Sequence, residues 1–177
     1  MDLVQSSILT TIITTNLTHF GEHLKLSEKT RIVVDTNILL DIIFFEDPHV
    51  EGLKNALENG QLEAWSCDLI WEEFLDVMRR PAFYKNEETY QKMIEKALKY
   101  FQFEVSKIPP STYKCRDPDD QTFIDLAVIK APCWLISRDL EVLKLAKKLK
   151  LVNVEVTSNK KTKLSLTPPW ESLIQIA

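Results

Sequence analysis

Short apolar runs separated by amphipathic stretches recur along most of the chain, and this alternation limits the folds available to it. The apolar runs predict buried strands at 31–34, 62–66, 103–105, 133–137 and 152–156. Helical spacing of apolar residues between them predicts helices over 37–45, 49–59, 68–79, 86–101, 118–130 and 140–149. Strands that alternate with helices need crossover connections, so we expect an α/β fold with a mainly parallel central sheet.

The chain of 177 residues has the length of one domain with a full core. Residues 1–30 differ from the rest because Ser and Thr are frequent among their apolar residues. Their spacing allows an amphipathic helix, although the β-branched residues keep a strand possible. We expect a helical N-terminal extension at 1–30 and a globular domain at 31–177, in which Pro168 and Pro169 open a short final helix.

Composition narrows the class of protein. The net charge of -4 and the pI near 5.5 argue against a broad basic surface for duplex binding. Only 3 Gly are present, which excludes Gly-rich phosphate loops. The 3 Cys include no C-x-x-C pair, so a cytoplasmic protein is expected. No apolar run is long enough to span a membrane, and the N-terminus does not have the pattern of a signal peptide.

Two of the expected strands are followed by an aspartate. Asp35 comes directly after three β-branched core residues, and Asp139 follows the strand at 133–137. An unpaired carboxylate costs several kcal/mol to bury, so a charge at such a position is expected to have a use. Ligands of parallel sheets sit beyond the carboxyl ends of the strands, and this topology could bring the two residues together.

The helix expected at 68–79 supplies a third acid. Ile70, Phe74 and Val77 form its apolar face, Glu73 flanks that face, and Glu72 points nearly opposite. Glu73 is therefore the better candidate for a partly buried site, although a helix acid is by default solvated.

A fourth candidate acid lies at the start of the helix expected at 118–130. Asp120 lies on the apolar stripe of that helix, whereas Asp117 and Asp119 are explained by capping of its first turn. Capping is also an alternative for Asp139, because it starts a helix. Asp35 is the acid that capping explains least.

Four inward carboxylates without basic partners repel one another, and a divalent cation would remove the repulsion. Ligands that are all oxygen favour Mg²⁺ or Mn²⁺ over zinc. Such clusters activate water and stabilise charge on a phosphate, so phosphodiester hydrolysis is the expected reaction class. Asn37, Ser137 and Asp117 are expected to orient the ligands, although Asn37 could equally be a helix cap.

Five segments resemble those of PIN-domain nucleases, and together they cover about residues 31–173. Val33–Asn37 resembles the opening of the family, and Glu73–Pro81 looks like a segment in which a Glu precedes a V-L-x-R-P ending. Cys115–Asp120 is similar to an R-D-P-x-D segment, Leu135–Asp139 to L-V-T-G-D, and Leu166–Leu173 to the closing segment. No single motif is decisive, but their common order is specific.

The resemblance implies a three-layer α/β/α fold and Mg²⁺- or Mn²⁺-dependent cleavage of RNA. Many such proteins look like the toxin half of toxin–antitoxin pairs, so an antitoxin partner is expected. The apolar faces of the N-terminal segment and of the helix at 86–101 are expected to form a homodimer or to bind the antitoxin. The resemblance also gives the catalytic and metal-binding set, which consists of Asp35, Glu73, Asp120 and Asp139. The candidates for contacts with the RNA backbone are Arg116, Arg138, Lys144, Lys147 and Lys148.

The sequence departs from this pattern at three positions. Ser137 replaces a Thr and keeps the hydroxyl, and Gln121 stands where an Asn is common. Arg138 replaces a Gly. The arginine could bind RNA phosphate, or it could pair with an acid and weaken the metal set.

Other classes of protein match parts of the sequence less well. His19–His23 has the letters H-x-x-E-H of a zinc protease class, but Gly21 weakens the helix that this motif needs. Haloacid-dehalogenase-type phosphatases need an acid where Asn37 stands, and receiver domains need paired acids earlier in the chain. A catalytically weak or inactive PIN-like binding or adaptor protein is the remaining alternative.

Overall fold

Five strands form a single parallel sheet in this computed structural model, which describes residues 29–158. They are β1 (Thr30–Val34), β2 (Leu62–Cys67), β3 (Phe101–Glu104), β4 (Cys133–Ile136) and β5 (Val154–Thr157). The order across the sheet is β3-β2-β1-β4-β5, and every neighbouring pair is parallel. The prediction of an α/β fold with a mainly parallel sheet is confirmed.

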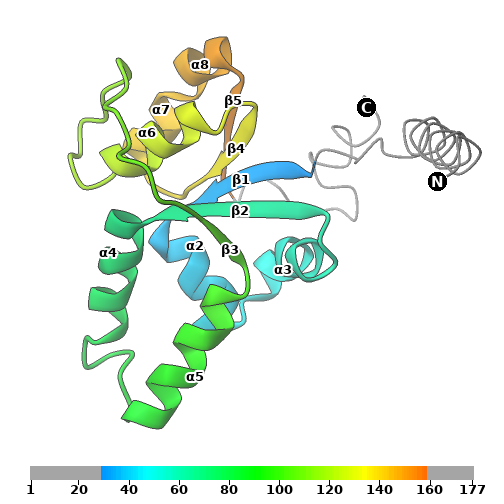
Figure 1. Cartoon of the computed structure of the whole chain (residues 1–177), viewed down its shortest axis with the longest axis vertical. Coiled ribbons are helices and arrows are strands. Elements are labelled where there is room, and N and C mark those ends of the chain that lie inside the picture. The colour runs from blue at the N-terminus through cyan, green and yellow to red at the C-terminus, as the bar shows by residue number, and fades with distance from the viewer. Residues whose placement is uncertain (1–28, 159–177) are drawn as a thin grey trace, which may run out of the picture.

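Helices cover both faces of the sheet, which gives the expected three layers (Figure 1). The layer beneath the sheet in Figure 1 contains α2 (Thr36–Leu40), the π-helical turn η1 (Asp41–Phe45), η2 (Pro48–Val50), α3 (Glu51–Glu58) and α5 (Glu87–Leu98). The other layer contains α6 (Gln121–Ile129), α7 (Leu140–Lys144), α8 (Ala146–Leu149) and η3 (Lys150–Val152). Helix α4 (Asp68–Met78) begins directly at the end of β2 and contributes side chains to both cores.

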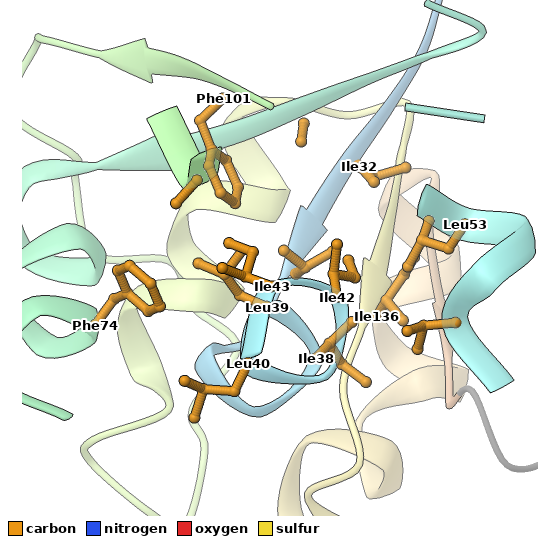
Figure 2. Close-up of a cluster of buried hydrophobic side chains, with 14 of the residues drawn as sticks. Ile32, Ile38, Leu39, Leu40, Ile42, Ile43, Leu53, Phe74, Phe101 and Ile136 are labelled. Atoms are coloured by element: carbon orange, nitrogen blue, oxygen red, sulfur yellow. The ribbon is translucent and has the colours of Figure 1, made fainter. Parts of the chain in front are cut away.

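Successive side chains of a strand point to opposite faces of the sheet, so the core consists of two clusters. Ile32 and Val34 of β1 face one cluster, and Val33 between them faces the other. All three are at most 3% exposed. Figure 2 shows the first cluster, where Ile38 and Ile42 of the α2–η1 segment pack near the strands. A sheet buried on both faces explains why its strands are continuous apolar runs.

Several element boundaries differ from the sequence prediction, most of them by one residue and some by two or three. The helix predicted to reach 101 ends at Leu98, because Tyr100 closes a turn onto Ala97 and Phe101 already pairs with Ala64 in the sheet. Strand β3 therefore covers 101–104, where 103–105 was expected. Residues 118–120 form a turn, so α6 begins at Gln121.

The C-terminal part of the described chain differs in two further details. The helix predicted over 140–149 is interrupted at Leu145, where α7 ends and α8 begins. The last strand begins at Val154, two residues later than expected. Residues 150–152 form a 3₁₀ turn, and Asn153 adopts a left-handed conformation with φ of 60°.

Several expectations lie outside the described residues. They concern the helical extension at 1–30 apart from its last two residues, the histidines of 19–23 and the final helix near Pro168. The division into an extension and a domain stays a prediction. Within residues 29–158, no helix has the length and apolar character needed to cross a membrane.

Candidate functional site

The strand order places a switch point between β1 and β4. From the central β1 the chain builds outward through β2 and β3, and it then returns to build β4 and β5 on the other side. Val34 and Ile136 are paired in register, and the Asp35 amide donates to the Ile136 carbonyl at 3.1 Å. The two strands lie side by side in Figure 1, and Asp35 and Ser137 therefore follow neighbouring strands at the edge where such sheets bind ligands.

Asp35 is 4% exposed and lies at the N-cap of α2. Its Oδ1 accepts from the Ile38 amide at 2.8 Å, and its Oδ2 accepts from the Arg138 amide at 3.1 Å. Asp35 was expected to be the acid that capping explains least, yet its side chain does cap α2. Burial raises the pKa of Asp35, and hydrogen bonds from Ser137, Ile38 and Arg138 act in the opposite direction. An ionised carboxylate has about four acceptor positions, so these three donors leave roughly one for a cation.

Ser137 connects two of the predicted site residues. It is 0% exposed, and its hydroxyl is hydrogen-bonded to Asp35. The same oxygen accepts from the Asp139 amide at 3.0 Å. Asp139 in turn caps α7 by accepting from the Glu141 amide at 2.6 Å. The hydroxyl of Ser137 thus connects the side chain of Asp35 to the backbone of Asp139.

Glu73 lies on the second turn of α4 and is more exposed than the sequence predicted. Partial burial of its carboxyl raises the pKa, and the negative charges of Asp35 and Asp119 raise it further. The Thr36 hydroxyl opposes this shift, although its contact with Glu73 does not reach ordinary hydrogen-bond geometry. Glu73 therefore faces the same acidic region as Asp35.

Asp120 occupies the N-cap position of α6 without accepting a capping hydrogen bond. Burial, followed by the charge of Asp139, raises its pKa to about 6, with smaller contributions from Asp117, Asp35 and Glu73. One carboxyl thus lies within the field of the three other acids of the predicted set. Asp117 does not cap α6 but accepts from the Asp119 amide at 3.0 Å within the preceding turn.

The loop that carries Asp120 is tied to α6 by Gln121 and Asp125. The Gln121 side chain accepts from the Cys115 amide at 2.9 Å. It donates to the Tyr113 carbonyl at 2.9 Å and to Asp125 Oδ1 at 2.7 Å. Asp125 also accepts from the Ser111 amide at 2.9 Å. The sequence prediction missed Asp125 because it looked for one apolar face, whereas 123–127 are all buried.

A second buried acid was also missed. Asp41 is 5% exposed and forms an ion pair with Arg138, with 2.5 Å between Oδ2 and Nη2. The arginine therefore pairs with an acid outside the predicted set. The signal was present in the sequence, because Asp41 interrupts an otherwise apolar run from 38 to 45.

The remaining predicted residues lie at the surface. Asn37, Arg116, Lys147 and Lys148 are exposed. Lys144 forms an exposed ion pair with Glu141 at 2.5 Å.

The donors at this edge match Mg²⁺ or Mn²⁺ in chemistry, because the four acids offer only oxygen. Between residues 29 and 158, however, no three His, Cys, Asp or Glu side chains are grouped closely enough to form a coordination shell. Carboxylates of like charge repel one another, and the raised pKa of Asp120 records this repulsion. The residues thus fit a divalent cation by type and by electrostatics, and closing the shell requires side-chain movement.

Comparison with known proteins identifies the fold. A family model described as PIN domain matches residues 31–141. The structure is similar to a chain in the crystal structure of VapBC2 from Rickettsia felis bound to a DNA fragment from their promoter, with a TM-score of 0.52 and 13% sequence identity. That match covers 73% of this chain and 98% of the other, and it bears on the fold alone. No curated protein matches the sequence.

Proposed function

This chain belongs to the PIN-domain family, and from that membership we propose that it is an endoribonuclease that cleaves RNA with the help of Mg²⁺ or Mn²⁺. Proteins of the family are generally nucleases. The observation that carries the proposal is the position of Asp120 among the other acids at the switch point: its pKa is raised to about 6, first by burial and then by the charges of Asp139, Asp117, Asp35 and Glu73. Acids whose pKa is raised by burial and by one another at a switch point are candidates for a functional site.

Each acid has a role in this proposal. Asp35, Glu73, Asp120 and Asp139 would hold the cation through carboxylate oxygens. When bound, a divalent ion supplies positive charge to the phosphate and lowers the pKa of a water molecule. Ser137 keeps Asp35 and Asp139 in place, and Asn37 and Asp117 are proposed to orient ligands and water around them.

The RNA backbone would contact exposed basic residues. Lys147 and Lys148 on α8 and Arg116 in the loop before α6 are exposed. These cations can contact phosphates without reading the base sequence. Lys144 is a weaker candidate because Glu141 already neutralises it.

The similarity to a chain of a VapBC2 complex supports a further part of the proposal, a role as the toxin of a toxin–antitoxin pair in the cytoplasm. A homodimer and an antitoxin partner would accompany this role. Light scattering of the full chain, alone and with the product of any adjacent small gene, tests both. A monomer that binds no such product would contradict this part without affecting the proposed chemistry.

Cleavage of a fluorescent single-stranded RNA tests the chemistry. Glu73→Gln is the sharpest variant, because within residues 29–158 no backbone amide donates to the Glu73 side chain, whereas Asp35 and Asp139 both accept such hydrogen bonds. We expect Mn²⁺-dependent cleavage to fall roughly 100-fold or more, since even residues that only support metal ligands contribute about 10–100-fold. Glu72→Gln, one residue away and exposed, is the matched control and should retain activity. Equal cleavage by wild type and Glu73→Gln would overturn the assignment.

The alternative is a PIN-like binding protein without catalysis. The absence of a closed carboxylate shell in the described residues is the observation in its favour. A titration with Mn²⁺ distinguishes the two, because a cation that binds the folded state raises its melting temperature. No stabilisation at millimolar Mn²⁺ would favour the binding protein.

A further inference from the structure

Arg138 links the loop after β4 to the helical segment after β1. Its Nη2 lies 2.5 Å from Asp41 Oδ2 and 3.3 Å from the Asn37 carbonyl oxygen. The Asp41 side chain is 7% exposed and that of Arg138 is 28% exposed. The guanidinium is thus held by two groups of the α2–η1 segment, about a hundred residues away in the sequence.

The backbone of the same residue contacts the candidate site. The Arg138 amide donates to Asp35 Oδ2 at 3.1 Å. Its neighbours on either side are Ser137, which bonds to Asp35, and Asp139. Anchoring the arginine side chain therefore fixes the direction of one of the donors to Asp35 and the path of the chain into Asp139.

The local form of η1 suits this contact. Asp41 is the first residue of the π-helical turn, and its carbonyl accepts from the amides of Glu46 and Asp47. These bonds fix the backbone of Asp41, so its carboxylate is presented to Arg138 from a constrained position. Wide helical turns of this kind are frequent at functional sites.

We propose that Asp41 and Arg138 act together as a positioning pair that holds the β4–α7 loop against Asp35, and that Arg138 is not a phosphate contact. The inference deepens the proposed function, because the positioned groups are two of its cation ligands.

Two readouts test the pair without relying on RNA cleavage. The first is amide hydrogen exchange of 136–140 in the metal-free protein. The second is Mn²⁺ affinity, measured from the spin-resonance signal of free Mn²⁺. We expect Asp41→Asn and Arg138→Gln each to speed exchange and to weaken Mn²⁺ binding by about 10–100-fold. The double variant should be no worse than either single variant, because both remove the same interaction.

A conservative variant and a control separate positioning from general destabilisation. Arg138→Lys keeps the charge next to Asp41 and should recover much of the Mn²⁺ affinity. Glu46→Gln breaks the exposed pair with Lys96 at the other end of η1, where the two groups lie 3.0 Å apart, and should change neither readout. Circular dichroism at the assay temperature identifies any variant that fails to fold, and Arg138→Lys then carries the test.

The outcomes are distinct. If wild type binds no Mn²⁺, the proposed function fails, and the exchange of 136–140 alone decides whether the pair positions the loop. Unchanged exchange and unchanged Mn²⁺ affinity in both single variants would overturn the pair. Weaker RNA binding in Arg138→Gln but not in Asp41→Asn, with a raised KM and unchanged kcat, would also overturn it and return Arg138 to the role of phosphate contact.

Discussion

The ammonium of Lys130 lies 2.7 Å from a carboxylate oxygen of Glu104 and joins the end of α6 to the end of the edge strand β3. Lys130 also lies 3.2 Å from the centre of the Trp65 ring, so one cation is held by a carboxylate and an aromatic face. The side chains of the ion pair are 11% and 19% exposed. This contact leads to a prediction about pH.

The hydrogen bond from Lys130, followed by those from Ser106, lowers the pKa of Glu104 from an ordinary 4.5 to about 2. A lowered carboxyl pKa contributes stability that is present above about pH 4.5 and is lost as the pH falls through 2. We expect Glu104→Gln to lower the free energy of unfolding at pH 7 and to approach wild type near pH 2. Urea denaturation across this range measures the difference, with Glu88→Gln at the exposed pair with Lys92 as the control. A difference that is independent of pH would contradict the prediction.

Asp120 is expected to destabilise the metal-free protein. Its pKa of about 6 lies above the ordinary 3.8, so its ionisation opposes folding as the pH rises from about 4 through 6. At pH 7.5 in EDTA, Asp120→Asn should therefore raise the free energy of unfolding. We expect about 1 kcal/mol, because solvent screening reduces the roughly 3 kcal/mol that two pKa units represent.

The same variant should lose stabilisation by Mn²⁺. Asp120→Asn would then be more stable than wild type in EDTA and less stable than wild type when Mn²⁺ is added. Thermal melting with and without Mn²⁺ shows both effects. Asp119→Asn is the matched control, because Asp119 is the neighbouring acid and is exposed. A variant that is less stable than wild type in EDTA would contradict the account of repulsion at this site.

The Gln121 side chain is expected to hold the loop that carries Asp117 and Asp120. Gln121→Ala removes its hydrogen bonds to Cys115, Tyr113 and Asp125 and should cost about 1–3 kcal/mol. Hydrogen exchange should rise over 111–120 while β1 and β4 remain protected. Gln61→Ala, at an exposed position after α3, should change neither quantity. Uniform loss of protection across the sheet would mean that Gln121 supports the whole domain and not this loop.

The basic surface of α8 is expected to bind RNA through charge alone. The double variant Lys147→Glu and Lys148→Glu should weaken RNA binding uniformly across sequences. Each lost phosphate contact should reduce the slope of log affinity against log salt by roughly 0.7–1. Fluorescence anisotropy in EDTA measures the slope without cleavage. Reversal of Lys92 on α5 and of Lys99 at its C-cap is the charge-matched control, and an equal effect there would argue against a defined RNA path.

The sheet could be predicted from the sequence because its strands are buried on both faces and appear as apolar runs. Ile32, Val33 and Val34 required only that pattern. The ends of helices were harder to predict where the apolar spacing continued past the last helical residue. Tyr100 and Phe101 extend the helical spacing of α5, but pairing of Phe101 with Ala64 draws the chain into the sheet. Tertiary pairing overrides local periodicity at such ends.

The candidate site was predictable to the extent that it depends on strand ends. Asp35 and Asp139 come to the same edge because parallel strands end together. The supporting contacts were not predictable, because they join residues far apart in the chain. No sequence pattern near Arg138 indicates that its guanidinium forms an ion pair with Asp41. Helical periodicity does not predict the π-helical turn at 41–45.

The capping of α2 by Asp35 has an evolutionary consequence. A descendant of this chain without the proposed RNA cleavage would still benefit from an aspartate at that position, because it starts the helix and accepts the Arg138 amide. Glu73, exposed on α4, would be free to drift. Among relatives with this fold, retention of the first aspartate is therefore a record of folding, and retention of the glutamate is the more telling sign that the chemistry is still under selection.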